Sequence, residues 1–464
     1  MRGIVVACAM AGLAACAPVG PDYRRPDLDV PKAYAESEPA GTTLPAVPAD
    51  WWRLYQDATL DRLMNAGLTQ GSDVRLAIAR IEEAAALRRE ANATLLPEID
   101  ASGVVSRSGS STQTPSVRAG AVSALGNFAL SANTAFELDF WGRLRRLREA
   151  AQAQYMATDY ARGVVELTLT AAIARTYFNV RSLDAQIAVS AESLTAAEDS
   201  VAITRRRSEG GIASELDVYQ AQGNRAQLAA QLKELRRERA VSMHQLGVLS
   251  GEPALALPPA DLRAIPTPPL PPAGLPSALL ERRPDLRQAE ASLVAANAQI
   301  GVARAAQLPT ISLTASLGLQ SDNLAHILSP GAEIWSIGVG LIGPVIDWGR
   351  YAARTEQAEA RARQSAILYG QALRTAFREV SDALSNVGLA AQTEQDLAAR
   401  VDYADKSLRL ATQRYEAGYS AYLEVLDAQR TLNDAKLALV RNRQSLLTFT
   451  VDLMNALGGG WTAA

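Results

Sequence analysis

The chain has 464 residues, of which 48% are hydrophobic and 20% charged, and this composition is typical of a folded protein rather than a disordered one. A formal net charge of -3 provides no basic field for a phosphate backbone, which argues against nucleic acid as a partner. Two cysteines and two histidines are too few for a disulfide framework or a Cys/His cluster, so the sequence predicts no metal site and no cofactor.

Residues 1–15 are predicted to be an export signal. Arg2 precedes an apolar stretch from Ile4 to Ala15, and these 12 residues are fewer than the roughly 20 that a spanning helix needs. The stretch ends in Leu13-Ala14-Ala15-Cys16, which resembles the bacterial lipobox, and Cys16 would then carry the acyl chains that anchor the mature protein to a bilayer. The alternative is a cleaved signal followed by an incidental cysteine.

The remainder of the chain is a tandem repeat. Ser72–Arg75 and Leu96-Pro97 recur 212 residues later, whereas Trp141-Gly142-Arg143 recurs 207 residues later. Ten of the 22 prolines lie between Pro253 and Pro284, and because proline interrupts helices and central strands, this stretch is predicted to link the two repeats. The predicted regions after the signal are a lipid-anchored and equatorial segment (16–66), a first repeat (67–252), the linker (253–284), a second repeat (285–457) and a tail (458–464).

Each repeat is predicted to contain a helix, two strands and a long helical hairpin. Arg143 to Glu209 has a single glycine and is rich in strong helix formers, which at 1.5 Å per residue predicts a rod of roughly 90–100 Å. Gly210-Gly211 and Gly418 mark the two hairpin tips.

Four segments alternate apolar and polar residues, at about 98–108, 128–140, 310–321 and 333–346. In the last, Trp335, Ile337, Val339 and Leu341 alternate with smaller or polar residues. Strands of this length and pattern are typical of a transmembrane β-barrel, although a sheet half-buried on a soluble core gives similar alternation. A lipid-facing sheet can have no open edge, and four strands are too few to close a barrel. Two copies would give a narrow, filled barrel, and three would give twelve strands with room for a channel.

Several spaced motifs resemble the outer membrane factor family, the TolC-like group, and most closely its OprM/NodT-like efflux lipoproteins. They are Leu138–Arg143, Arg282–Leu286, Ala295–Arg304, Arg414–Gly418 and Ala456–Trp461. The resemblance implies a mainly α fold with a membrane β-barrel, in which a homotrimer forms a 12-stranded barrel in outer-membrane lipid and a helical tunnel across the periplasm. It also implies docking to a periplasmic adaptor and an inner-membrane RND pump, with no catalytic residues. The alternative is a lipid-anchored coiled-coil scaffold of the cell envelope whose sheet packs on itself.

In this family, acidic residues ring a periplasmic constriction formed by the second hairpin. Matched by motif, these positions are Glu424 and Asp427, with Tyr415 beside the turn and Asp217 in the first hairpin. Because threefold symmetry would make each carboxylate a ring of like charges, such a ring attracts cations. We hypothesise that Tyr415 or Arg414 bonds to Asp217 and latches the closed state.

The hairpin tips are the expected docking surface for the adaptor. Some relatives have a basic residue two positions after the tip glycine, where this chain has Ser420, so the latch is expected to be weaker or differently built. A solvated helix face is the alternative for the basic run near the first tip. The expected docking residues are Gly210, Gly211, Gly418, Arg205, Arg206 and Arg207.

Overall fold

The computed structural model describes residues 18–27, 34, 47–109, 124–269 and 279–461. The export signal and the predicted lipidation site, Cys16, lie outside the described residues. The chain forms two compact units, each assembled from separate segments of both repeats. The first unit comprises Met1–Asp27, Arg80–Thr158 and Ala289–Tyr369, and the second comprises Leu28–Ala79, Asp159–Gln288 and Gly370–Ala464.

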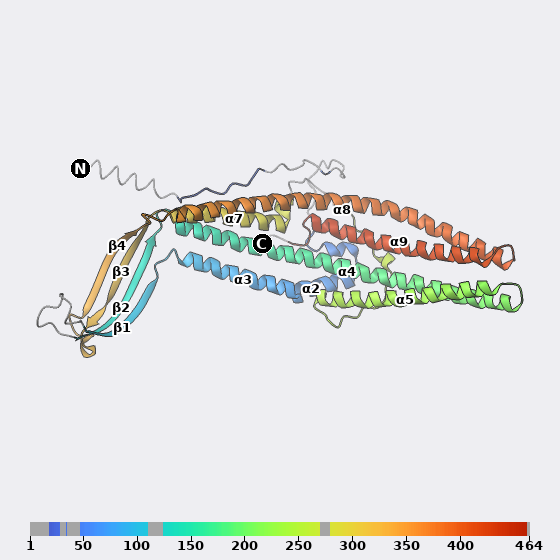
Figure 1. Ribbon diagram of the computed structural model, residues 1–464, viewed down its shortest axis with the longest axis horizontal. Coiled ribbons are helices and arrows are strands. Elements are labelled where there is room, and N and C mark those ends of the chain that lie inside the picture. Colours follow the sequence, from blue (N-terminus) through green and yellow to red (C-terminus); the bar gives the residue numbers. More distant parts are fainter. Residues whose placement is uncertain (1–17, 28–33, 35–46, 110–123, 270–278, 462–464) are drawn as a thin grey trace. The chain divides into compact units, whose positions relative to one another are not determined.

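The first unit contains one four-stranded antiparallel sheet in the order β1-β2-β3-β4 (Figure 1). The strands are β1 (Ile99–Gly109), β2 (Ala124–Leu138), β3 (Thr310–Ser321) and β4 (Glu333–Ile342). Four antiparallel strands are therefore confirmed, but β2 begins and ends earlier than the predicted 128–140. β4 stops short of the predicted residue 346 because Pro344 has no N–H to donate to a ladder. Among the described strands, β1 and β4 each leave one edge unpaired.

The two faces of the sheet differ sharply. Across the strands, Leu317 lies opposite Trp335 and Leu313 opposite Val339, and this apolar face is bare: Trp335 is 75% exposed and Val339 71%. The other face carries hydroxyls and amides that bond to one another. Ser316 and Ser336 are 2.8 Å apart between their Oγ atoms. A sheet packed on its own core would cover the apolar face, so the half-buried soluble sheet is not what this chain forms.

The strand register preserves the tandem repeat. Ile99 pairs with Thr134 in the first hairpin of strands, and the residues 212 and 207 positions later, Ile311 and Leu341, pair in the second. The five-residue difference between the two offsets therefore lies in the segments that connect the paired strands. The residue pairs of the two ladders correspond one to one. Each repeat supplies one equivalent two-stranded ribbon.

An extended N-terminal segment lies beside the place where β2 turns into α4. Val19 donates its N–H to the Trp141 carbonyl at 2.9 Å, and a Cβ on Gly142 would lie 2.6 Å from Pro18. Further along, Asp22 accepts from the buried guanidinium of Arg146 at 2.6 Å. Residues 18–22 are therefore held against the helix-proximal end of the strands.

Eight α-helices form the described helical part of the chain, and two of them are 67 residues long (Figure 1). None of the described helices is long and apolar enough to cross a membrane. The long helices α4 and α8 each pair with a shorter antiparallel partner to make a hairpin. The helices are α2 (Ala58–Gln70), α3 (Ser72–Ala93), α4 (Arg143–Glu209), α5 (Glu215–Ser250), α6 (Leu279–Arg282), α7 (Pro284–Ala305), α8 (Arg350–Glu416) and α9 (Tyr422–Ala456).

The main core of the second unit is aromatic. Trp51 and Tyr55, on the short 3-10 helix η1 (Trp51–Tyr55), are 1% and 0% exposed and pack with Phe178 of α4. Asp57 caps α2 by accepting from two backbone N–H groups, and it also accepts from the Tyr177 hydroxyl at 2.6 Å. The segment before the first repeat is thereby built into the helical core.

A buried acidic residue fastens the start of the proline-rich linker to this core. The Asp184 carboxylate accepts from Arg181, from Arg239 and from the Ala260 N–H, and its side chain is only 2% exposed. Both arginines also donate to linker carbonyls, Arg181 to Pro258 at 2.7 Å. One carboxylate therefore holds α4, α5 and the linker together.

Candidate functional site

The two hairpin tips have the same backbone design. At the first, the Ile212 N–H donates to the Arg207 carbonyl at 2.8 Å across Gly211, whose φ is +72°. At the second, the Tyr419 N–H donates to the Arg414 carbonyl at 2.8 Å across Gly418, whose φ is +78°. Such left-handed caps favour glycine, because other residues pay a steric cost there. The tip glycines thus lie at the turns where the sequence predicted them.

The second tip has a small aromatic core. The rings of Tyr415 and Tyr422 are 5.6 Å apart and edge to face, and both residues are nearly buried. The Arg207 guanidinium of the first hairpin lies 4.7 Å from the Tyr415 ring and donates to the Glu416 carbonyl at 3.2 Å. Within one chain, Arg207 therefore joins the two hairpins at their tips.

The predicted latch bond is not present within the chain. Arg414 instead lies 3.9 Å from Glu424, between the Nε and Oε2 atoms, and the Tyr415 hydroxyl has no hydrogen-bond partner among the described residues. Within the chain neither Arg414 nor Tyr415 bonds to Asp217, and a latch between copies stays a prediction. Consecutive helix residues point about 100° apart, so Tyr415 turns inward to Tyr422 while Arg414 turns outward.

Burial also acts on the ionisation of Tyr415. It raises the pKa of the phenol above its ordinary value, Arg207 opposes this, and the charge of Asp217 adds to it. The phenol is therefore neutral over the physiological range, and it contributes ring packing rather than charge to the tip.

The side chain of Ser420 makes no hydrogen bond that would fasten the second tip to another described residue. Its Oγ is buried and has no hydrogen-bond partner among the described residues, and α9 begins without a side-chain cap. The first hairpin differs, since Ser214 caps α5 by accepting from the Asp217 N–H at 3.3 Å. The second tip is therefore the less firmly capped of the two.

One exposed face of α9 carries the predicted gate carboxylates and a third that sequence reasoning missed. Glu424 and Asp427 are exposed, and Asp434, one heptad beyond Asp427, lies exposed on the same face. Its spacing was the signal that could have found it. The Arg414 pair offsets the charge of Glu424 only weakly, by about 1 kcal/mol or less, because both side chains are more than half exposed.

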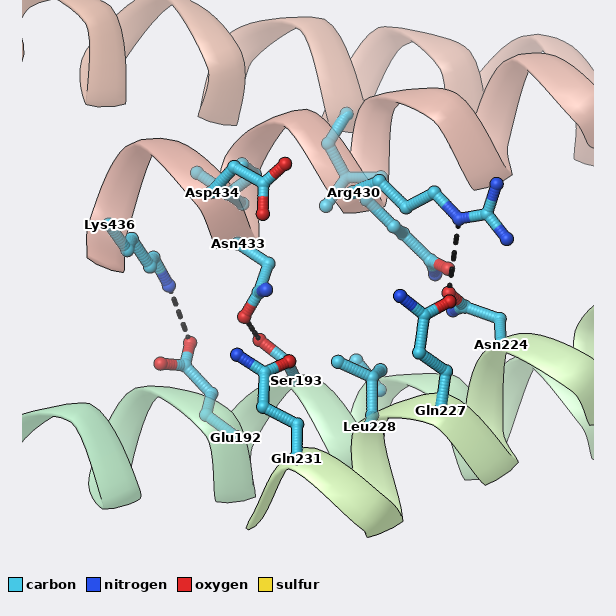
Figure 2. Close-up of a pocket in the computed structure, with 14 residues that line it drawn as sticks. Glu192, Ser193, Asn224, Gln227, Leu228, Gln231, Arg430, Asn433, Asp434 and Lys436 are labelled. Carbon is cyan, nitrogen blue, oxygen red and sulfur yellow. Dashed lines mark hydrogen bonds and ion pairs between the residues drawn. The ribbon is translucent and has the colours of Figure 1, made fainter. Parts of the chain in front are cut away.

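A crevice of about 190 Å³, lined mainly by polar side chains, lies between α9 and the α4–α5 hairpin (Figure 2). Side chains of α9 reach across it: Lys436 pairs with Glu192 at 2.9 Å, and Asn433 accepts from the Ser193 hydroxyl at 3.0 Å. These contacts tie α9 to the first hairpin. Movement of α9 past α4 would break them.

The three arginines near the first tip differ in exposure. Arg205 and Arg206 are exposed, whereas Arg207 is partly buried against the second hairpin. Arg205 and Arg206 are therefore the more accessible of the three, and adaptor docking by all three stays a prediction.

A four-stranded sheet with a bare apolar face and two long helical hairpins in one chain are the features of an outer-membrane channel protein. The family model for outer membrane efflux proteins matches residues 63–252 and 275–459, and the chain belongs to this family. It acts in the outer membrane, as a channel through which compounds leave the cell.

The chain is similar to known efflux proteins over almost the full length of both. The chain is 34% identical over 452 residues to the probable efflux pump outer membrane protein TtgC of Pseudomonas putida, covering 95% of this chain and 92% of that protein. It is 32% identical over 466 residues to the cation efflux system protein CusC of Escherichia coli, covering 98% of each. The solved structure of the outer-membrane channel OprN matches with a TM-score of 0.88 at 29% identity, covering 96% of this chain and 99% of that one.

Proposed function

We propose that three copies of the chain assemble into one passive exit duct of a tripartite, RND-type efflux system. The observation that carries the proposal is the four-stranded sheet whose apolar face is bare and whose β1 and β4 edges are unpaired. In hydrocarbon, each unpaired backbone group costs several kcal/mol, so the edges must be closed by other copies. Three copies give twelve strands and leave a lumen, which the polar face would line.

The hairpin tips supply the proposed contact with partner proteins. We infer that the tips, including Gly210, Gly211, Gly418, Arg205 and Arg206, dock a periplasmic adaptor that serves an inner-membrane pump. The names of the relatives, which describe components of efflux pumps and efflux systems, support a multi-component assembly. The duct itself carries out no catalysis, and the pump supplies the energy.

We also propose that Cys16 is lipidated and anchors the chain to the outer membrane. Pro18, two residues further on, lies against Gly142 beside the end of β2. The described chain therefore begins beside the helix-proximal end of the strands, which supports an anchor near the sheet.

The gate is proposed to be the exposed face of α9 at its N-terminal end. In a trimer, Glu424 and Asp427 become stacked rings of three carboxylates, which repel one another and attract cations. Opening would require α9 to move away from the first hairpin, which breaks the contacts of Lys436 and Asn433 across the crevice.

The assembly is tested by the oligomeric state of the full-length protein in detergent. A duct is expected to run as a heat-modifiable trimer and to need detergent for solubility. The competing envelope scaffold needs neither, so a detergent-independent monomer would refute the duct.

The gate is tested by single-channel recording in planar bilayers. The double variant Glu424→Gln with Asp427→Asn is expected to weaken cation preference, because the rings lose their charge without losing much volume. Conductance is expected to rise because cations are no longer held at the constriction. Asp402→Asn, an exposed acidic residue on α8, serves as the matched control. Equal conductance of the gate variant and the control would rule out the carboxylate gate.

A further inference from the structure

The junction between β2 and α4 contains a tryptophan that fastens two neighbouring strands. Trp141 follows β2 and donates its indole N–H to the carbonyl of Pro309 at 2.7 Å. Pro309 directly precedes β3, the strand that pairs with β2. Both residues are half-buried at this contact. The indole thus closes the helix-proximal end of the β2–β3 ladder.

The equivalent tryptophan in the second repeat follows β4, an edge strand, so no described strand lies beside β4 for its indole to bond to. Trp348 follows β4 at the position matching Trp141, and it is 95% exposed, as is the preceding Val345. Its indole N–H makes no hydrogen bond to any described residue. Its φ is +55°, a left-handed conformation that is costly for a bulky side chain.

The missing partner surface is also present, at the opposite edge of the sheet. Leu96-Pro97 precedes β1 as Leu308-Pro309 precedes β3. Leu308 and Pro309 are half-buried, whereas Leu96 is 68% exposed and Pro97 is exposed. One chain therefore carries a bare tryptophan beyond one edge strand and a bare Leu-Pro corner before the other.

We propose that Trp348 donates its indole N–H to the carbonyl of the partner subunit's Pro97, as Trp141 does to Pro309 within the chain. This rests on the proposed trimer, in which β4 of one copy pairs with β1 of the next, and it specifies how the copies lock together. The occupant is a second copy because the repeat supplies both halves of the contact. A closed ring uses three such staples.

The same equivalence fixes the register between copies. Leu138 pairs with Ile311 inside the chain. Adding 207 to the β2 residue number and subtracting 212 from the β3 residue number converts this pairing into one between β4 of one copy and β1 of the next. It places Val339 of one copy opposite Val105 of the partner subunit, with both side chains on the apolar face. The equivalence is sound for this purpose because it already reproduces the β3–β4 register from that of β1–β2. The proposed ladder between β4 of one copy and β1 of the next would begin at Ile342 and run towards the start of β4.

Cysteine cross-linking tests the register. Directly opposed residues have Cβ atoms about 4.5–5.5 Å apart, close enough for a disulfide after small adjustment, whereas diagonal neighbours lie about 7–8 Å apart. The variant carrying Val105→Cys and Val339→Cys is expected to give covalent trimers on oxidation of outer membranes. Within one chain these positions are separated by two strands, roughly 14 Å, and cannot bond.

The matched control shifts the pairing by two residues on the same face, using Val105→Cys with Leu341→Cys. It should cross-link about tenfold less, and each single cysteine variant should give no covalent trimer. If the shifted pair cross-links better than the matched pair, the register is wrong.

The staple itself is tested by Trp348→Phe, which keeps an aromatic side chain but removes the indole N–H. The dissociated fraction at a fixed temperature below the trimer midpoint should rise by at least about fivefold, the effect of losing one ordinary hydrogen bond at each interface. Trp141→Phe is the control, since it removes the same bond inside each copy and should affect trimer dissociation much less. An unchanged dissociated fraction in Trp348→Phe would make this residue an aromatic anchor in lipid and overturn the staple.

These outcomes separate the inference from the function on which it rests. A trimer that fails both the cross-linking and the Trp348 tests refutes the staple and leaves the duct intact. A protein that is monomeric in detergent before any substitution refutes both.

Discussion

The Asp184 cluster gives the sharpest prediction about stability. Asp184→Ala removes a carboxylate that is 2% exposed and leaves Arg181, whose side chain is 4% exposed, with one linker carbonyl and the face of Tyr177. Removing one partner of a buried pair typically costs about 3–5 kcal/mol, because the remaining charge stays buried without compensation. The free energy of unfolding of the helical part is expected to fall by that amount. The proline-rich linker should also become sensitive to protease near Pro258.

Urea denaturation of the detergent-purified protein, followed by far-UV circular dichroism, measures the change. The matched control is Asp402→Ala, which removes an exposed aspartate that pairs with Lys406 one helical turn away, and it should cost less than about 1 kcal/mol. If Asp184→Ala and Asp402→Ala destabilise the protein equally, the cluster does not hold the linker and the reasoning from burial fails.

Three further predictions concern the sheet and the second tip. Val339→Arg places a charge on the apolar face and should cost about 2–4 kcal/mol in the bilayer, lowering the yield of outer-membrane trimer on fractionation, while Ser316→Arg on the polar face should assemble normally. Gly418→Ala should destabilise the tip by about 1 kcal/mol because φ is +78°, whereas Gly388→Ala, inside α8 with open space around it, should stabilise by a similar amount; equal signs in thermal melts would contradict this. Burial raises the pKa of Tyr415, so the stability that depends on its protonated phenol is complete below pH 10.0 and is lost as the pH rises through the raised value. The difference between the tyrosinate absorbance titrations of the original protein and of Tyr415→Phe isolates the ionisation of Tyr415. This ionisation should occur at a higher pH than that of the exposed tyrosines, and ionisation at the same pH would count against burial.

The features of the candidate site that depend on residues close together in the chain could be predicted from the sequence. Gly211 and Gly418 could be placed at the tips because a left-handed turn between two helices favours glycine wherever it occurs. Glu424 and Asp427 on α9 followed from the motif match, whereas Asp434 was missed although its heptad spacing could have indicated it. The partners of Arg414 and Tyr415 could not be predicted, because they depend on how α8 and α9 rotate against each other and on how the first hairpin brings Arg207 to the tip, and no periodicity in one helix records the orientation of its neighbour.

The sequence by itself determined the tandem repeat, the four alternating strands and the long proline-free helices, since each of these depends on residues close together in the chain. Only the tertiary structure showed that the compact units cut across the repeats and that Asp184 gathers two arginines and the linker. It alone also showed that Trp141 is covered while Trp348 is bare. Two nearly identical motifs acquire different surroundings because one lies between paired strands and the other lies at an edge, and pairing across the sheet joins residues that are far apart in the chain.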